Sequence, residues 1–453
     1  HSQEKCRFTS DSGVDGRTLR ELYLAAFETA AKEGKPSTVM CAYPKLNGVH
    51  CSDHRELLTD ILRPEWGFDG MVVTDWGAMN DRIEGFRAGC DLNMPGGSAY
   101  MEKEVLAAVK AGTLPESAVD DSARRVLRLA FRAAETLKEK AECDYDAHHT
   151  LAARAAEQGA VLLKNEGDIL PLKQGTKVAV IGEFAQKARY QGAGSSVVNP
   201  TRLDNAMDVI KTFGLDVAGF EPGYPRSGAG DPAMRSKAAE LAKQADVVLL
   251  YIGLDEISEA EGLDRSHMKL AQSQIDLIEA VSAANPNVVA VMSAGSAVEM
   301  PWLPKVKALV HGYLCGQAGA GSVLKVITGQ VNPSGKLAES YPVRYEDVSS
   351  APYFPSKERT AEYREGLFVG YRYFETANVP VLFPFGFGLS YTSFEYSDLK
   401  VSEKEATFTL KNSGKMDGAE VAQLYVSKPD GDVFRPVKEL KGFAKVFLKA
   451  GES

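Results

Sequence analysis

The chain has 453 residues, of which 44% are hydrophobic, so it is too long for one core and about three domains are expected. Its 52 Lys and Arg residues against 61 Asp and Glu residues give a net charge of −9, without a long run of either sign. This balance argues against a nucleic-acid partner or an anionic membrane and favours a small neutral partner.

The six cysteines are scattered and form no CxxC motif. In a chain of this size they indicate reduced, buried thiols rather than disulfides or a zinc site, with a Cys41–Cys51 pair as the minority alternative. No apolar stretch reaches membrane-spanning length, and the first residues lack a secretory-signal pattern. The acidic, disulfide-poor composition weakly favours a cytoplasmic location.

Residues 1–138 alternate amphipathic helices with short apolar strands. Helices are predicted at 17–35, 52–66, 80–89 and 115–138, and strands at 37–43, 70–76 and 90–96. Buried strands that alternate with helices imply a parallel sheet covered on both faces, in a barrel or a doubly wound fold. A polar linker is predicted over 139–150.

A second parallel α/β domain is predicted over 151–345. It begins with a helix at 151–165, and its strands are expected at 177–182, 246–253, 287–295 and 308–314. An aromatic, turn-rich connecting segment follows over 346–393. The alternating pattern of 394–453 predicts a small antiparallel β-sandwich that the chain does not complete.

Polar residues at the carboxyl ends of parallel strands are candidates for chemistry, because those ends form the ligand-binding edge of such folds. Asp75 closes the strand at 70–76, and Tyr43 closes the strand at 37–43. Two structural alternatives stay open: Asp75 could cap the next helix, and Tyr43 could be a core residue instead of a hydrogen-bond donor to a neighbouring carboxylate.

A second set of carboxylates lies in "IGLDEISEAEGLDRSHMKL", residues 252–270, directly after a buried strand. The structural alternative is a solvated loop in which Arg265 pairs with Glu261 or Asp264. Two strand-end carboxylate loops, one in each α/β domain, suit glycoside hydrolysis, in which one carboxylate is a nucleophile and the other a protonated acid.

The residues also resemble a known family. "LRPEWGFDGMVVTDW" resembles the barrel of glycoside hydrolase family 3, "SEAEGLDR" its acid/base loop, and "YREGLFVGYRYFE" with "FPFGFGLSYTSFEY" its passage into a fibronectin-III-like domain. The resemblance implies the C-terminal part of a TIM-like (β/α) barrel, then an (α/β)6 sandwich domain, then a partial fibronectin-III-like β-sandwich. It implies no cofactor and no metal.

By this resemblance Asp75 matches the catalytic nucleophile, and Glu259, the first Glu of the "ExEG" stretch, matches the general acid/base, with Glu261 as its main rival. Tyr43 matches the residue that hydrogen-bonds the nucleophile. Trp76 is expected to face a sugar ring, with core packing as the alternative.

The implied activity is that of an exo-acting retaining β-glucosidase, which hydrolyses terminal non-reducing β-D-glucosyl residues through a covalent glycosyl-enzyme intermediate. The substrate would be a small β-glucoside or oligosaccharide. A β-xylosidase or α-arabinofuranosidase of the same family is the nearest alternative, and a non-catalytic carbohydrate-binding protein is the alternative from another class.

The family's first barrel strands have no counterpart here, so the chain is expected to be a fragment that needs the missing N-terminal half of the barrel. An open half barrel would expose a strand edge and apolar core. The sequence is also compatible with a homodimer.

Other conspicuous side chains are given structural interpretations. His148 and His149 are expected to be solvated linker residues, and Arg63, Glu65 and Asp69 to form salt bridges and turns around the strand at 70–76.

Overall fold

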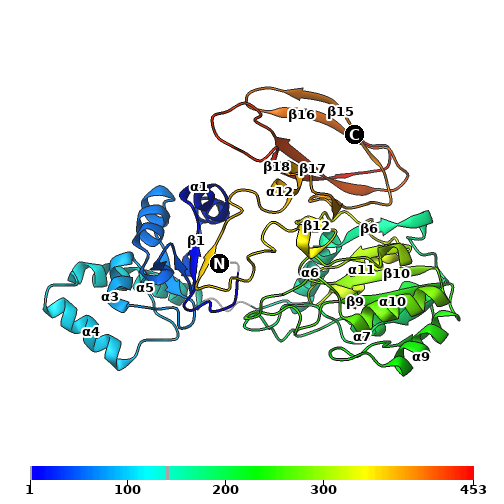
Figure 1. Cartoon of the computed structure of the whole chain (residues 1–453), viewed down its shortest axis with the longest axis horizontal. Helices are drawn as coiled ribbons and strands as arrows, with labels where there is room; N and C mark the ends of the chain where they lie inside the picture. Colours follow the sequence, from blue (N-terminus) through cyan, green and yellow to red (C-terminus); the bar gives the residue numbers. More distant parts are fainter. Residues whose placement is uncertain (1–2, 139–141) are drawn as a thin grey trace. The chain divides into compact units, whose positions relative to one another are not determined.

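The computed structural model describes residues 3–138 and 142–453, and the chain divides into two compact units (Figure 1). Unit 1 combines the segment up to Cys143 with Ser350–Val369, and unit 2 combines Asp144–Ser349 with Gly370–Ser453. None of the described helices is long and apolar enough to cross a bilayer. All six cysteines are free thiols, so the Cys41–Cys51 alternative is wrong.

The helices of unit 1 follow the predicted order. They are α1 (Gly16–Thr18), η1 (Leu19–Tyr23), α2 (Ala25–Thr29), η2 (Ala30–Gly34), η3 (Cys51–Asp53), η4 (Glu56–Glu65), α3 (Arg82–Ala88), α4 (Ala99–Lys110) and α5 (Glu116–Thr136). The first four form one nearly continuous helical run where a single helix was predicted. Helix α4 was not predicted; Ser98 caps it by accepting a hydrogen bond from the N–H of Met101.

The central strands of unit 1 are parallel, as predicted. β2 (Thr38–Cys41) pairs with β5 (Met71–Thr74), and the third predicted strand is reduced to one parallel bridge between Val73 and Leu92. A second sheet has the order β13-β1-β3-β4, from β13 (Thr360–Glu362), β1 (Asp11–Gly13), β3 (Lys45–Leu46) and β4 (Val49–His50). Part of the predicted connecting segment, 346–393, therefore belongs to unit 1 through β13.

One edge of β2 and an adjoining groove are open. Among the residues that the structure describes, β2 pairs only with β5. The groove beside it has a volume of about 450 Å³, and its apolar lining includes Leu24, Phe27 and Met40. Phe27 and Met40 are more than half exposed. An exposed apolar face of this size is characteristic of a surface that another segment covers.

Unit 2 is built on a six-stranded sheet of order β6-β11-β10-β9-β7-β8. Its strands are β6 (Val161–Asn165), β7 (Lys177–Ile181), β8 (Asp216–Glu221), β9 (Val247–Gly253), β10 (Val288–Ser293) and β11 (Ala308–His311). Only β6 is antiparallel to its neighbour. The predicted helix at 151–165 is wrong over its last residues, because a short buried apolar run suits either element and pairing with β11 makes it a strand.

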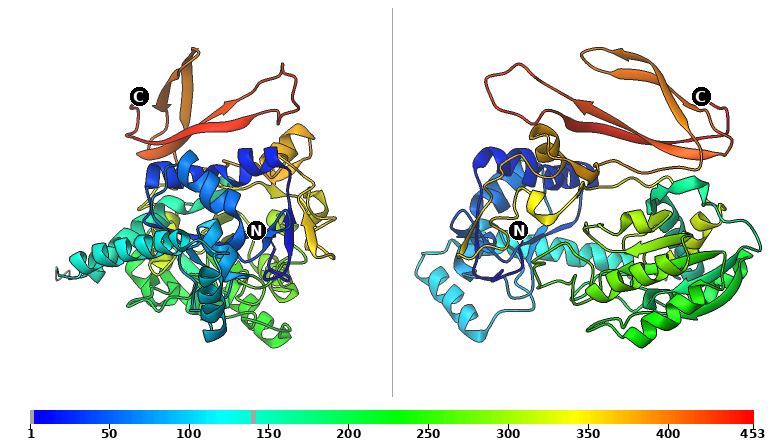
Figure 2. Two further views of the ribbon diagram at one scale, coloured as in Figure 1. Left: turned by 90° about the vertical axis from the view of Figure 1, so that its left-hand side faces the viewer. Right: turned by 45° about the vertical axis from the view of Figure 1, so that its right-hand side comes forward.

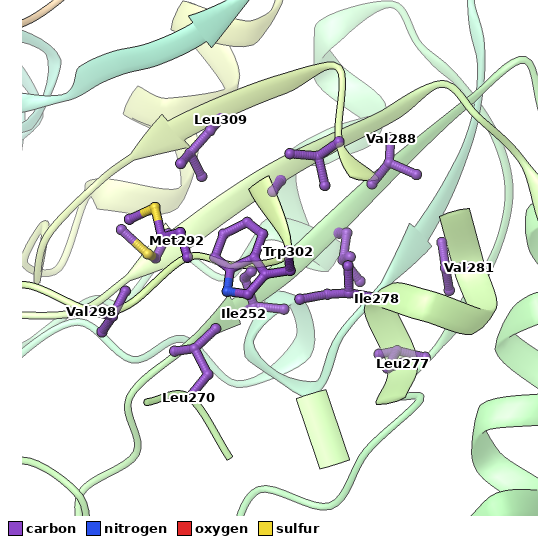
Figure 3. Close-up of a cluster of buried hydrophobic side chains, with 14 of the residues drawn as sticks. Ile252, Leu270, Leu277, Ile278, Val281, Val288, Met292, Val298, Trp302 and Leu309 are labelled. Atoms are coloured by element: carbon purple, nitrogen blue, oxygen red, sulfur yellow. The ribbon is translucent and has the colours of Figure 1, made fainter. Parts of the chain in front are cut away.

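Helices cover both faces of this sheet, which explains why its strands are apolar throughout. One face carries α9 (Pro232–Ala242) and α10 (Gln272–Ala284); the other carries α7 (Glu183–Gln186), α8 (Ala206–Val209) and α11 (Gly319–Ile327). Figure 3 shows Leu277, Ile278 and Val281 of α10 among the buried strand residues Ile252 and Met292. The sheet is thus a rigid support for the loops at its ends.

The predicted linker over 139–150 is only partly a linker. Residues 139–141 lie outside the described residues, and α6 (Tyr145–Gly159) begins within the rest, capped by Asp144. His149 is therefore buried on a helix, where its Nε2 lies 3.2 Å from Asp204 Oδ2. The prediction that His149 is a solvated linker residue is wrong, because its half-buried carboxylate partner compensates its loss of water.

The C-terminal part of unit 2 is antiparallel, as predicted. It contains β12 (Tyr341–Pro342), α12 (Tyr371–Thr376), β14 (Val381–Phe383), β15 (Phe394–Val401), β16 (Ala406–Asn412), β17 (Gly418–Val426) and β18 (Glu439–Leu448). β15 pairs with β16 and β17 with β18, each pair antiparallel (Figure 2). Short 3-10 turns complete unit 2: η5 (Glu166–Asp168), η6 (Ile210–Phe213), η7 (Leu303–Lys305) and η8 (Tyr345–Asp347).

Candidate active site

Asp75 follows the last residue of β5, and its carboxylate accepts hydrogen bonds from Tyr43 and Trp76. The hydroxyl of Tyr43 lies 2.8 Å from Asp75 Oδ1, and the backbone N–H of Trp76 lies 2.6 Å from the same oxygen. The register partners Cys41 and Thr74 place the ends of β2 and β5 side by side. The hydrogen bond expected between Tyr43 and the carboxylate on the neighbouring strand is therefore present.

The helix-cap alternative for Asp75 is wrong. Asp81 caps the next helix, α3, by accepting hydrogen bonds from the N–H groups of Ile83 at 2.8 Å and Glu84 at 3.1 Å. Trp76 is 54% exposed, so its ring does not pack into the core of unit 1. Asp75 and Trp76 thus lie at a strand end, where Asp75 does not cap the next helix and Trp76 does not pack into the core.

Aromatic and cationic neighbours surround Tyr43. Its ring centroid lies 4.4 Å from that of Phe8, and the guanidinium carbon of Arg7 lies 4.8 Å from the same ring. A cation over a tyrosine face is attracted by the ring's electron density. Sequence reasoning missed both residues, because the segment that carries them has no periodic pattern.

A buried carboxylate fixes the strand that carries Asp75. Asp91 is 3% exposed and accepts a hydrogen bond from the N–H of Val72 at 2.8 Å. Its two oxygens also accept bonds from Arg63 at 3.1 Å and from Arg125 at 2.8 Å. The structural role predicted for Arg63 is confirmed. Since Val72 lies in β5, this ion cluster holds the strand whose end presents Asp75.

The carboxylates of the second domain lie where the strand order reverses. The chain runs from β7 outward to β8 and then returns to β9 on the other side of β7. In open α/β sheets such a switch point makes a crevice at the carboxyl ends of the strands. The loops that follow β7, β9 and β10 lie at this edge. The loop after β9, residues 254–264, carries both Glu259 and Glu261.

The loop after β10 holds the side chain of Glu259, which itself belongs to the loop after β9. Its Oε2 accepts a hydrogen bond from the N–H of Gly295 at 2.8 Å, and its Oε1 accepts one from the hydroxyl of Ser296 at 2.7 Å. A Cβ at position 295 would lie 3.0 Å from Glu259 Oε1, so glycine at this position leaves room for the carboxylate. Buried Arg189 also donates to the backbone oxygen of Glu259 at 2.9 Å.

The segment between α7 and α8 holds the side chain of Glu261, which itself belongs to the loop after β9. The N–H of Ser195 donates to Glu261 Oε2 at 2.8 Å, and the Ser195 hydroxyl donates to the same oxygen. The backbone N–H of Glu261 donates to the oxygen of Ala193 at 3.2 Å. Glu261 is exposed, whereas Glu259 is half-buried. The two candidate carboxylates therefore point to different neighbouring loops.

Arg265 bonds to the loop after β10. Its Nη1 donates to the hydroxyl oxygen of Ser296 at 2.7 Å and to the backbone oxygen of Ala297 at 3.1 Å. Sequence reasoning considered Glu261 or Asp264 as its partner. It also missed Ser195 and Ser296, although Ser296 follows a predicted strand and so met the strand-end criterion applied to Asp75.

Comparison with known families accounts for both units. Residues 9–129 match the glycosyl hydrolase family 3 N terminal domain, residues 160–391 match the family's C-terminal domain, and residues 420–453 match a fibronectin type III-like domain. The chain belongs to glycosyl hydrolase family 3. The α/β architecture ending in a fibronectin-III-like domain, predicted from the sequence, agrees with this membership.

Curated family members resemble the whole chain. It is 48% identical to thermostable beta-glucosidase B of Acetivibrio thermocellus over 463 residues, covering 100% of this chain and 61% of the relative. It is 43% identical to an exo-alpha-(1->6)-L-arabinopyranosidase of Bifidobacterium breve, covering 100% of this chain and 62% of the relative. The chain thus spans about three fifths of the length of these curated relatives.

A solved family structure has the same fold. The crystal structure of the Bifidobacterium adolescentis GH3 beta-glucosidase superposes with a TM-score of 0.95 at 41% identity, covering 99% of this chain and 67% of that chain. Among the described residues, no group of three His, Cys, Asp or Glu side chains is arranged to hold a metal ion.

Proposed function

We propose that the protein is an exo-acting retaining β-glucosidase that releases terminal non-reducing β-D-glucosyl residues through a covalent glycosyl-enzyme intermediate. The observation that carries the proposal is the environment of Asp75. Both of its donors, Tyr43 and the Trp76 N–H, bond to Oδ1, and among the described residues no donor bonds to Oδ2. A carboxylate that is oriented through one oxygen can attack with the other.

The proposed mechanism has two steps. Asp75 Oδ2 attacks the anomeric carbon while a general acid protonates the departing glycosidic oxygen, which leaves glucose bonded to Asp75. The deprotonated acid then takes a proton from water, and the resulting hydroxide attacks the same carbon and releases Asp75. Exposed Trp76 offers an apolar face for the sugar ring.

Hydrogen-bond polarity bears on the choice of general acid. Ser296 Oγ accepts a hydrogen bond from Arg265, so its own hydrogen points to Glu259 Oε1, and the Gly295 N–H points to Oε2. Both oxygens of Glu259 are thus held by hydrogen bonds from the loop after β10. Glu261, in contrast, is exposed, and its carboxylate bonds to Ser195. We therefore propose Glu261 as the general acid/base, although motif register favours Glu259.

The relatives support β-glucosides as the substrate class, since two of the three proteins compared are named β-glucosidases. The arabinopyranosidase of Bifidobacterium breve makes α-L-arabinopyranosides the second candidate substrates. None of these three names supports the β-xylosidase or α-arabinofuranosidase alternative.

Hydrolysis of 4-nitrophenyl β-D-glucopyranoside by the full-length protein tests the proposal. Asp75→Asn should lower kcat/KM by on the order of 10⁴-fold or more. Glu261→Ala should lower turnover of unactivated glucosides by about 10²- to 10⁴-fold. With 2,4-dinitrophenyl β-D-glucoside, whose leaving group departs without a proton, added azide should restore turnover of Glu261→Ala as β-glucosyl azide, because the anion occupies the space of the missing carboxylate and attacks the glycosyl-enzyme without a general base.

Glu259→Ala serves as the comparison and should gain nothing from azide. Azide rescue of Glu259→Ala instead would return the acid role to Glu259. Binding of glucose without hydrolysis of glucosides or α-L-arabinopyranosides would favour the non-catalytic carbohydrate-binding protein.

We also propose that further barrel strands of the full-length protein cover the open groove beside β2, where Phe27 and Met40 are exposed. A dye that fluoresces on apolar surfaces should bind the 453-residue chain strongly and the full-length protein weakly. Equal binding to both would contradict this proposal.

A further inference from the structure

We propose that Ser296 and Arg265 are positioning residues that act through Glu259 to fix the 254–264 loop, so that Glu261 is presented to the substrate. The inference rests on the proposed function, and it assigns a task to Glu259 other than proton transfer. We call the chain of contacts Arg265, Ser296 and Glu259 the loop clamp.

The loop clamp has a defined direction. The guanidinium of Arg265 can only donate, and its Nη1 lies 2.7 Å from Ser296 Oγ. The hydroxyl hydrogen of Ser296 is thereby directed to Glu259 Oε1, 2.7 Å away. Arg265 is itself oriented by the Ala297 oxygen at 3.1 Å. Each member thus sets the orientation of the next, and the chain of contacts ends on the carboxyl group of Glu259.

The loop clamp acts on a loop that is already held at its start. Buried Arg189 donates to the backbone oxygens of Leu254 at 3.3 Å and Glu259 at 2.9 Å. Arg226 makes a two-pronged ion pair with Glu256, at 2.6 and 3.1 Å. Both contacts precede Glu261, so the Glu259 carboxylate is the side-chain anchor next to the proposed acid.

The strand before the loop is equally fixed. The side chain of Gln274 on α10 bonds both the N–H and the C=O of Gly253, each at 2.9 Å. Gly253 has a φ of +153°, and a Cβ there would lie 1.8 Å from the Ser293 oxygen. The ends of β9 and β10 therefore meet without a side chain between them. The loop clamp adds side-chain hydrogen bonds between the loops that follow these two strands.

Removing one hydrogen-bonding group tests the loop clamp. Ser296→Ala in the full-length protein deletes the hydroxyl that joins Arg265 to Glu259. For cellobiose, whose leaving group must be protonated, kcat/KM should fall about tenfold or more, since a hydrogen bond to a charged group is lost. For 2,4-dinitrophenyl β-D-glucoside, whose leaving group departs without a proton, kcat/KM should change less than about threefold.

Two further variants define the mechanism of the effect. Glu259→Gln keeps the side-chain volume but replaces one of the two accepting oxygens with an NH2 group, which cannot accept a hydrogen bond. It should therefore have the same effects on kcat/KM as Ser296→Ala. Ser236→Ala is the matched control, because Ser236 is exposed on α9 and its hydroxyl donates to the Pro232 oxygen of the same helix. This control should behave as the wild type with both substrates.

Amide hydrogen exchange provides a readout that does not depend on activity. Exchange across 254–264 should be faster in Ser296→Ala than in the wild type or Ser236→Ala. Unchanged exchange would overturn the loop clamp. Faster exchange together with equal losses of kcat/KM for both substrates would show that the loop clamp does not act through the general acid. A wild-type protein that hydrolyses neither substrate, yet shows faster exchange in the variant, would retain the loop clamp and refute the proposed function.

Discussion

The hydroxyl of Tyr43 lies 2.8 Å from Asp75 Oδ1 and joins the carboxyl ends of two parallel strands, β2 and β5. The contact orients the carboxylate through one oxygen. It depends on strand register, because a slip of one residue would turn Tyr43 or Asp75 to the opposite face of the sheet.

Tyr43→Phe should lower kcat/KM for aryl β-glucosides by about ten- to a hundredfold, because it removes a hydrogen bond to a charged group while keeping the ring. Steady-state kinetics of the full-length protein measure the effect. The control is Tyr145→Phe, at an exposed tyrosine on α6. A Tyr43→Phe enzyme with wild-type kinetics would show that the bond does not orient the nucleophile.

Asp91→Ala should destabilise unit 1 by about 3–5 kcal/mol, because it leaves the half-buried guanidinium groups of Arg63 and Arg125 without their carboxylate. Thermal unfolding followed by circular dichroism measures the change. Asp69→Ala is the comparison, since its exposed carboxylate lies 3.6 Å from Arg128, and its effect should stay below about 1 kcal/mol. Equal effects of the two variants would contradict the structural role of Asp91.

Glu339→Gln should change how the stability of unit 2 depends on pH. The pKa of Glu339 is raised to about 7, chiefly by burial; an Ala297 backbone hydrogen bond and Arg265 oppose the rise, and nearby Glu259 contributes to it. The native state keeps a proton that the unfolded chain, with an ordinary pKa of 4.5, has lost. The stability that this proton contributes is present below about pH 4.5 and is lost as pH rises to about 7.

The variant lacks this titration, so its stability relative to the wild type should rise by about 1 to 3 kcal/mol between pH 4.5 and 8. Chemical denaturation at both pH values measures the difference. A difference that does not vary with pH would show that Glu339 titrates alike in the native and unfolded states.

His311 should make unit 2 acid-sensitive. Burial lowers its pKa to about 4, a hydrogen bond to Met292 opposes this only in part, and Tyr341 Oη lies 2.7 Å from its Nε2. Between the ordinary pKa of 6.5 and about 4, the unfolded chain binds the proton that the native state excludes. The stability contributed by His311 is therefore present above about pH 6.5 and lost as pH falls to about 4.

His311→Gln should lose less stability than the wild type between pH 7 and 4.5, by about 1 to 3 kcal/mol. Thermal unfolding at the two pH values checks this. Parallel losses in both proteins would assign the acid sensitivity to other groups.

Much of the fold could be predicted from local pattern. The strands at β5, β7, β9, β10 and β11 are buried apolar runs between helices, and β2 is a short apolar run of the same kind with an open edge, so this contrast is visible in the sequence. β6 was predicted as helix, because Val161–Leu163 suit either element until pairing with β11 decides between them. β8 was missed because its residues are only half-buried and carry no continuous apolar run.

The sequence by itself determined the family, the order of most strands and helices, and the positions of Asp75 and the 254–264 loop at strand ends, since these depend on local periodicity and motif. Only the tertiary structure decided the partners: Tyr43 with Asp75, Ser296 with Glu259, and Ser195 with Glu261. The physical reason is that such hydrogen bonds join residues far apart in the chain. Their formation depends on strand register and on loops meeting at a sheet edge, which local sequence does not encode.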